Sequence, residues 1–195
     1  HWVRAALEHL ELQSSPAFNS YCRHSNLEGD DFVEHLRQAA RFWQDALRVA
    51  EMLGIQDAEV ALSRSRDFAA VRRLHDRWTD RLNQRQAQVI DGPTLFPPPP
   101  VPGNDEIHPI TSLEDLQAEG RLMHHCITVY QPKILARESY IYRMLVPERA
   151  TIELRIESNV IKVGQISLAY NAQPSDATRA TVSSWLSCFN ESKTS

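Results

Sequence analysis

The residues most able to do chemistry stand together in one short run, from Glu119 to Tyr130. Within it His125 precedes Cys126 directly, and Tyr130 follows Cys126 by four residues, about one helical turn. A histidine beside a cysteine can activate a thiolate nucleophile or supply two ligands to a metal ion. Neighbouring side chains on a helix point apart, however, and no further donor stands at a metal-like spacing. A buried cysteine beside a hydrogen-bonded core histidine is the structural alternative, and we expect no metal and no cofactor.

A second chemical pattern is a row of arginines at intervals of four residues within the segment 67–88. On a helix this row lies opposite the apolar stripe of the same segment, where it could follow the phosphates of DNA or RNA. Asp76 and Asp80 are near neighbours on that helix and would partly neutralise the row. A solvated amphipathic face is therefore the alternative. The candidate nucleic-acid-binding residues are Arg66, Arg73, Arg77, Arg81 and Arg85.

The first half of the chain must position these arginines, and its apolar spacing is helical throughout. Residues 30–53 and 67–88 carry the clearest stripes, with Asp67 as a plausible N-cap, and a shorter helix is expected over 2–12. Residues 91–109 contain seven of the eleven prolines. Proline cannot donate to a helix or a strand ladder, so this stretch is predicted to be a linker. We predict a helical domain over 1–90, a proline-rich linker over 91–109 and a second domain over 110–195.

The second domain is predicted to be α+β. Ser112, with Asp115 three residues later, is typical of a helix start, and Gly120 ends or bends that helix. A further helical stretch is expected over 121–130. Three strand-like runs follow, at 140–146, 150–156 and 159–170, and their short connections favour an antiparallel sheet of three strands or more. A terminal helix is expected over 175–190.

Composition limits the function classes. The chain has 195 residues, 42% hydrophobic, and 21 basic against 25 acidic side chains, for a net charge of −4. It therefore lacks the strong positive bias of a protein that coats nucleic acid, and any basic site must be local. No apolar run is long enough to cross a membrane, so we expect no membrane partner. Three widely spaced cysteines are typical of reduced thiols in a cytoplasmic protein.

The run from Glu119 to Tyr130 and the strands after it resemble the PcfJ-like family, whose members occur on conjugative plasmids, phages and other mobile elements. The family pattern is a Leu–Glu–Gly helix, then His-Cys and Tyr, a Thr-Leu-Glu strand, and Gln followed by Asn. His75 and Asp76 are similar to its His-Asp segment. This chain has Ile127 and Thr128 where related sequences often have Val-Gly. The matching residues are Glu119, Gly120, His125, Cys126, Tyr130, Thr151, Glu153, Gln165 and Asn171.

The resemblance suggests how distant polar groups could meet. Glu153 lies on the polar face of the strand at 150–156, and Gln165 follows Gly164, where backbone can approach closely. If the His-Cys helix covers that face, these groups would converge in one cleft. Glu153 would then serve as general acid or base, while a strand carboxylate paired with Arg155 or Arg143 is the alternative. The candidate catalytic residues are His125, Cys126, Tyr130, Glu153, Gln165 and Asn171.

Three functions follow as hypotheses. The first is an accessory or effector protein of a mobile genetic element that acts on or around DNA or RNA. The second is an enzyme with a polar cleft built from His125, Cys126, Tyr130, Glu153 and Gln165, whose reaction the sequence does not specify. The third is a module that binds another protein through the helical domain.

Overall fold

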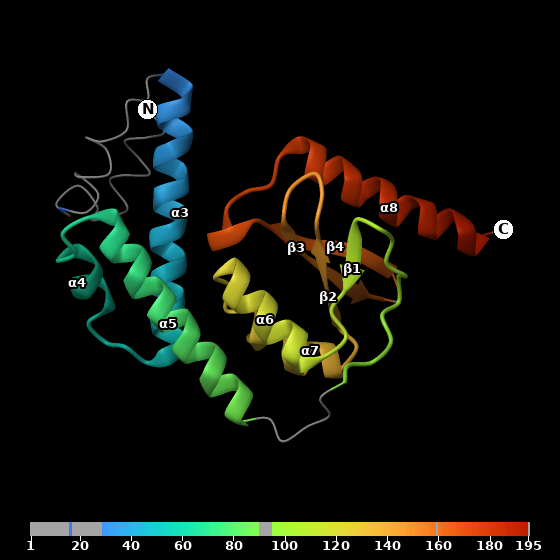
Figure 1. Cartoon of the computed structure of the whole chain (residues 1–195), viewed down its shortest axis with the longest axis horizontal. Helices are drawn as coiled ribbons and strands as arrows, with labels where there is room; N and C mark the ends of the chain where they lie inside the picture. Colours follow the sequence, from blue (N-terminus) through green and yellow to red (C-terminus); the bar gives the residue numbers. More distant parts are fainter. Residues whose placement is uncertain (1–15, 17–28, 90–94, 159, 195) are drawn as a thin grey trace. The chain divides into compact units, whose positions relative to one another are not determined.

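The computed structural model describes residues 16, 29–89, 95–158 and 160–194 (Figure 1). The chain divides into two compact units, residues 1–82 and 83–195. The first holds α3 (Gly29–Leu53), α4 (Ala58–Ser63) and most of α5 (Phe68–Val89). The helices predicted over 30–53 and 67–88 are thus confirmed, whereas the one predicted over 2–12 lies outside the described residues.

The core of the first unit forms where the apolar stripes of α3 and α5 meet. The ring of Phe42 on α3 lies 5.4 Å from that of Phe68 on α5, and Trp43 and Trp78 are both buried. Asp67 caps α5 as expected, because its Oδ1 accepts a hydrogen bond of 2.7 Å from the Ala70 N–H. The same stripe leaves the arginines of α5 on the solvent side.

The second unit is built on a four-stranded antiparallel sheet, in the order β1 (Ile107–Pro109), β2 (Ser139–Met144), β3 (Ala150–Glu157), β4 (Val160–Ser167). The predicted α+β fold and the meander of β2 to β4 are confirmed. Strand β1 is an addition to the prediction. It is short and ends in Pro109, which cannot donate to a ladder, so an edge position suits it.

Helices cover both faces of this sheet (Figure 1). On one face α8 (Asp176–Thr194) packs Val182 and Leu186 against Tyr142, Ile152 and Leu154. On the other lie α6 (Leu113–Met123), the 3₁₀ helix η2 (Ile127–Tyr130) and α7 (Gln131–Leu135). Because side chains alternate along β3, Thr151, Glu153 and Arg155 face this second layer.

The helical stretch predicted over 121–130 is wrong at 124–126, because α6 ends at Met123 and the 3₁₀ helix η2 begins only at Ile127. Ser112 caps α6 as predicted, its Oγ lying 3.1 Å from the Asp115 N–H, but α6 continues through Gly120 to Met123. His124 then adopts the left-handed conformation with φ of 54°. The next N–H, that of His125, returns to the Gly120 carbonyl at 3.0 Å. His125 and Cys126 therefore lie in a turn rather than on a helix.

Residues 95–109, part of the predicted linker, contact the sheet of the second unit. The Phe96 N–H donates to the Thr111 carbonyl at 2.8 Å, and the Phe96 side chain is buried. Val101 is fully buried in the core beneath α8. Its carbonyl accepts a hydrogen bond of 2.8 Å from the Tyr142 hydroxyl.

Candidate functional site

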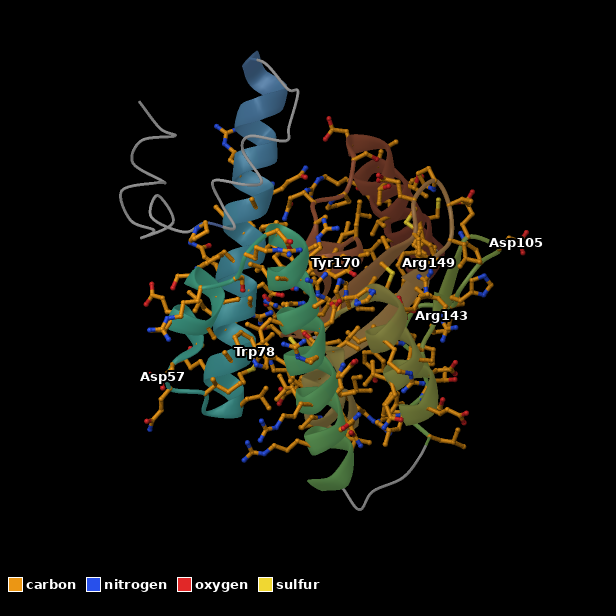
Figure 2. All side chains as sticks on the ribbon, turned by 60° about the vertical axis from the view of Figure 1, so that its left-hand side comes forward. Asp57, Trp78, Asp105, Arg143, Arg149 and Tyr170 are labelled. Carbon is orange, nitrogen blue, oxygen red and sulfur yellow. The ribbon has the colours of Figure 1, made fainter. Side chains whose placement is uncertain are left out.

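Glu119 joins α6 to the sheet through buried polar contacts. Its carboxylate accepts a hydrogen bond of 2.7 Å from the Thr151 hydroxyl and is ion-paired with Arg149. The Arg143 Nε lies 4.0 Å away, and Arg143 also pairs with Asp115 at 2.8 Å. Figure 2 shows Arg143 and Arg149 close together over this region. A charge of this kind is stable in an interior only when it is paired, and the two arginines supply the pairing.

Gly120 allows α6 to come very close to its neighbours. A Cβ atom at this position would lie 3.1 Å from the His125 carbonyl oxygen and 3.2 Å from Asn83 Nδ2. Asn83 itself donates to the His125 carbonyl at 3.0 Å and accepts from the Thr128 hydroxyl at 2.6 Å. The sequence analysis missed Asn83, whose only local signal is that it directly follows Leu82 of the apolar stripe on α5.

The His125 imidazole meets the segment around η3 (Ala169–Asn171). Its Nε2 lies 2.8 Å from the Leu168 carbonyl oxygen and 3.3 Å from the Asn171 N–H. The first contact needs a protonated Nε2 and the second needs a lone pair. Because the contact with the Leu168 carbonyl is the shorter one, we assign the tautomer that carries its proton on Nε2. His125 and Asn171, both candidates from the sequence, therefore lie side by side.

Left-handed residues surround this contact. His124, Tyr170 and Asn171 have φ of 54°, 58° and 56°. The rings of His124 and Tyr170 stack with centroids 4.1 Å apart and an interplanar angle of 11°. Left-handed backbone costs about 1–3 kcal/mol for a residue with a side chain and concentrates at functional sites. The sequence analysis singled out neither His124 nor Tyr170.

Glu153 is buried, with 3% of its surface exposed, and is held from two strands. Both of its oxygens accept hydrogen bonds of 2.9 Å from Arg155, and Oε1 also accepts one of 3.0 Å from the Ser139 hydroxyl. Gln165 is its cross-strand partner on β4 and donates to the Ser167 hydroxyl at 2.7 Å. Glu153 and Gln165 are thus brought together, and Glu153 has the ion pair with Arg155 that the sequence analysis gave as its alternative.

Tyr130 belongs to the surroundings of this pair. Hydrogen bonding to Glu153 is the main cause that raises the pKa of Arg155, and the Tyr130 phenol contributes a smaller increase. The Lys133 ammonium lies 5.7 Å from the centre of the Tyr130 ring. The Tyr130 phenol therefore lies near the Arg155 guanidinium, which in turn binds the Glu153 carboxylate.

Cys126 is buried and directly precedes η2. Among the described residues, no group of three or more His, Cys, Asp or Glu side chains could hold a metal ion. Apart from Cys126, the candidate catalytic residues form two groups, one with His125 and Asn171 and the other with Glu153, Gln165 and Tyr130.

In the first unit His75 is completely buried and its Nε2 lies 3.0 Å from Asp45 Oδ2. Burial alone would raise the pKa of Asp45, but hydrogen bonds from His75 and Arg48 lower it to about 2. Asp76 lies farther away, 3.6 Å from His75 Nδ1. The aspartate that pairs most closely with His75 is therefore Asp45, which the sequence analysis did not select.

The arginine row of α5 is exposed along its whole length. Arg66 lies just before the helix, 3.3 Å from Asp67, and Arg73 lies 3.9 Å from the same carboxylate. Within the described parts of the chain, Arg77, Arg81 and Arg85 have no acidic oxygen within 4.0 Å. Four residues of helix rise by about 6 Å, so their guanidinium groups follow one another along one side.

Comparison with known proteins shows a family resemblance. The family model described as PcfJ-like protein matches residues 42–183, which is more than half of the chain. No curated protein and no solved structure matches. Over the described residues, no helix is both long and apolar enough to span a bilayer.

Proposed function

Since the chain belongs to the PcfJ-like family, we propose that it is an accessory protein of a mobile genetic element that binds DNA or RNA in the cytoplasm through α5. The contact surface is the row of Arg73, Arg77, Arg81 and Arg85. The observation that carries the proposal is that Arg77, Arg81 and Arg85 are exposed and without an acidic partner among the described residues.

The chemistry of the row fits phosphate. Arginine stays charged at every physiological pH, and its planar fork can donate two hydrogen bonds to a phosphate group. Two arginines of the second unit are instead used internally, since Arg149 pairs with Glu119 and Arg155 pairs with Glu153. The row therefore provides local positive charge on a protein whose net charge is −4.

Binding to fluorescently labelled single-stranded DNA, duplex DNA and RNA tests the proposal, with anisotropy measured over a range of salt concentrations. The triple substitution Arg77→Gln, Arg81→Gln and Arg85→Gln should weaken binding similarly for unrelated sequences. The slope of log K against log salt should become shallower by roughly one for each lost contact.

The matched control is the triple substitution Arg64→Gln, Arg121→Gln and Arg137→Gln. It removes the same charge from exposed arginines that lie off α5 and form no ion pair among the described residues. This control should keep affinity and salt slope close to those of the unchanged protein. Equal losses of affinity in the two triple variants would show that binding depends on overall charge rather than on the α5 row. That result, or absence of binding at low salt, would overturn the proposal.

A second candidate is an enzyme that processes the bound nucleic acid, with His125 as a proton-transfer group. The left-handed backbone at His124, Tyr170 and Asn171, gathered around one imidazole, favours it. His125→Gln should then abolish conversion of a labelled oligonucleotide while leaving its affinity unchanged. If the unchanged protein yields no product, this second candidate is excluded.

A further inference from the structure

A pocket lies between α8 and the segment 102–106 that leads into β1, entirely within the second unit. Its volume is about 540 Å³, within the usual range of about 300–1,000 Å³ for small-ligand sites. The lining includes the aromatic rings of Trp185 and Phe189, the Ser184 hydroxyl, the Cys188 thiol and the Glu106 carboxylate. None of these residues belongs to the α5 row or to the His125 and Glu153 groups.

The walls of the pocket are held in place by specific contacts. The Trp185 indole N–H donates to the Pro102 carbonyl at 3.1 Å, and its ring meets Tyr142 edge-on with centroids 5.0 Å apart. The turn at Gly103 is closely packed, since a Cβ atom there would lie 2.6 Å from the Ile107 carbonyl oxygen. Asn104 Oδ1 accepts the N–H groups of Glu106, at 3.0 Å, and Ile107, at 2.7 Å. The site is therefore formed before any ligand arrives.

The charge of the pocket is negative. Among the described residues that line the pocket, Glu106 is the single acidic side chain, and none is basic. Glu106 is partly buried. In the part of the chain that the structure describes, Glu106 forms no ion pair. A carboxylate beside aromatic rings, with no cation supplied by the lining itself, is complementary to a cation from outside.

We propose that this pocket binds a guanidinium group. The planar guanidinium can donate two parallel hydrogen bonds to the Glu106 carboxylate and stack on the face of an aromatic ring, and both partners are present here. The group could be carried by a small guanidine or by an arginine side chain of another protein. This site is independent of the nucleic-acid surface proposed on α5.

Cys188 provides a local probe of occupancy, because its thiol is exposed and lines the pocket. Alkylation of Cys188 by iodoacetamide is followed by mass spectrometry of its peptide, with buried Cys126 as an internal indicator of unfolding. Ethylguanidine is the first probe, and neutral ethylurea of the same shape is its control. Only the unoccupied fraction reacts, so the rate should fall about tenfold at a probe concentration about nine times the Kd. Ethylurea should leave the rate unchanged.

Two variants test the carboxylate. Glu106→Gln should abolish protection by ethylguanidine, because the amide keeps the shape and removes the charge. Asp105→Asn is the matched control, since Asp105 is an exposed acidic neighbour that does not line the pocket (Figure 2). It should retain protection. Equal loss in the two variants, equal protection by ethylguanidine and ethylurea, or no protection by any guanidine probe would overturn the proposal.

A capped Gly-Arg-Gly peptide and its citrulline counterpart distinguish the two sources of the guanidinium. Protection by ethylguanidine and by the arginine peptide alike supports a site for the group itself. Protection by the arginine peptide alone assigns the site to a protein side chain. The citrulline peptide, which is neutral and of the same shape, should fail to protect Cys188 in either case.

Discussion

Gly164 lies so close to Glu153 that a Cβ atom placed on it would come within 2.8 Å of the Glu153 Oε2. The same atom would lie 2.7 Å from Nε and 2.9 Å from Cγ of Arg155. Gly164 also occupies the irregular register between β3 and β4, where one strand carries an extra residue. The ion pair between Glu153 and Arg155 is thus packed directly against Gly164.

Gly164→Ala should therefore lower the free energy of unfolding by about 1–3 kcal/mol, the usual cost of overpacking. Urea unfolding monitored by circular dichroism measures the change. In an Arg155→Ala background two of the three close contacts are absent, so the same substitution should cost clearly less. An equal cost in the two backgrounds would show that the contact with the ion pair is not the cause.

Replacing Arg155 should destabilise the fold more than replacing its partner Glu153. Glu153 is 3% exposed and the Arg155 side chain 45% exposed, so only Arg155 can regain water when its partner is lost. Arg155→Gln leaves a buried charge and should cost about 3–5 kcal/mol of unfolding free energy. Glu153→Gln should cost about 1–2 kcal/mol. Thermal unfolding of both variants measures the two losses of stability. A larger loss for Glu153→Gln than for Arg155→Gln would contradict the prediction.

The hydrogen bond from His125 to Leu168 predicts a single tautomer. Nitrogen-15 NMR at neutral pH should show His125 protonated at Nε2, because the Leu168 carbonyl at 2.8 Å can only accept. His125→Phe should lower the unfolding free energy by about 1–3 kcal/mol, since it leaves a polar carbonyl without its donor. An Nδ1–H tautomer would instead make the Asn171 N–H, at 3.3 Å, the operative partner.

Asp45 should give the first unit a characteristic acid sensitivity. Its pKa is about 2 in the folded chain and 3.8 in the reference state, because hydrogen bonds from His75 and Arg48 outweigh the opposing effect of burial. The carboxylate therefore contributes about 2 kcal/mol at pH values above 4, and this contribution disappears as the pH falls from 4 to 2. Asp45→Asn should be less stable than the unchanged chain at pH 7, and the difference should vanish near pH 2. A difference independent of pH would contradict the assignment.

Local signals made much of the fold predictable. The helix over 67–88 follows from its apolar spacing and from Asp67, whose side chain does cap α5. The meander follows from strict alternation and short connections, and its register places Glu153 opposite Gln165. In each case residues near in sequence carry the information that decides the structure.

The parts that could not be predicted depend on distant contacts. Nothing in the residues around His124 ends a helix, yet the chain turns there and His125 reaches Leu168, forty-three positions away. Strand β1 exists only through its pairing with β2. Asn83 lies on α5, where the sequence singles out only the arginines, and Arg149 lies in the connection between β2 and β3, so their contacts with His125 and Glu119 were not predicted.

The Tyr142 hydroxyl accepts a hydrogen bond of 3.3 Å from the Val101 N–H and donates one of 2.8 Å to the Val101 carbonyl. A single side chain thus satisfies both backbone groups of one residue in the proline-rich segment, as a neighbouring strand would. A fragment of this protein made for expression must therefore keep Val101 together with Tyr142. A fragment that starts at residue 110 would lose Phe96, Val101 and Ile107 and leave open space beneath α8 and α6. A fragment that starts at residue 95 keeps all three, and we expect it to resist protease where the shorter one is digested.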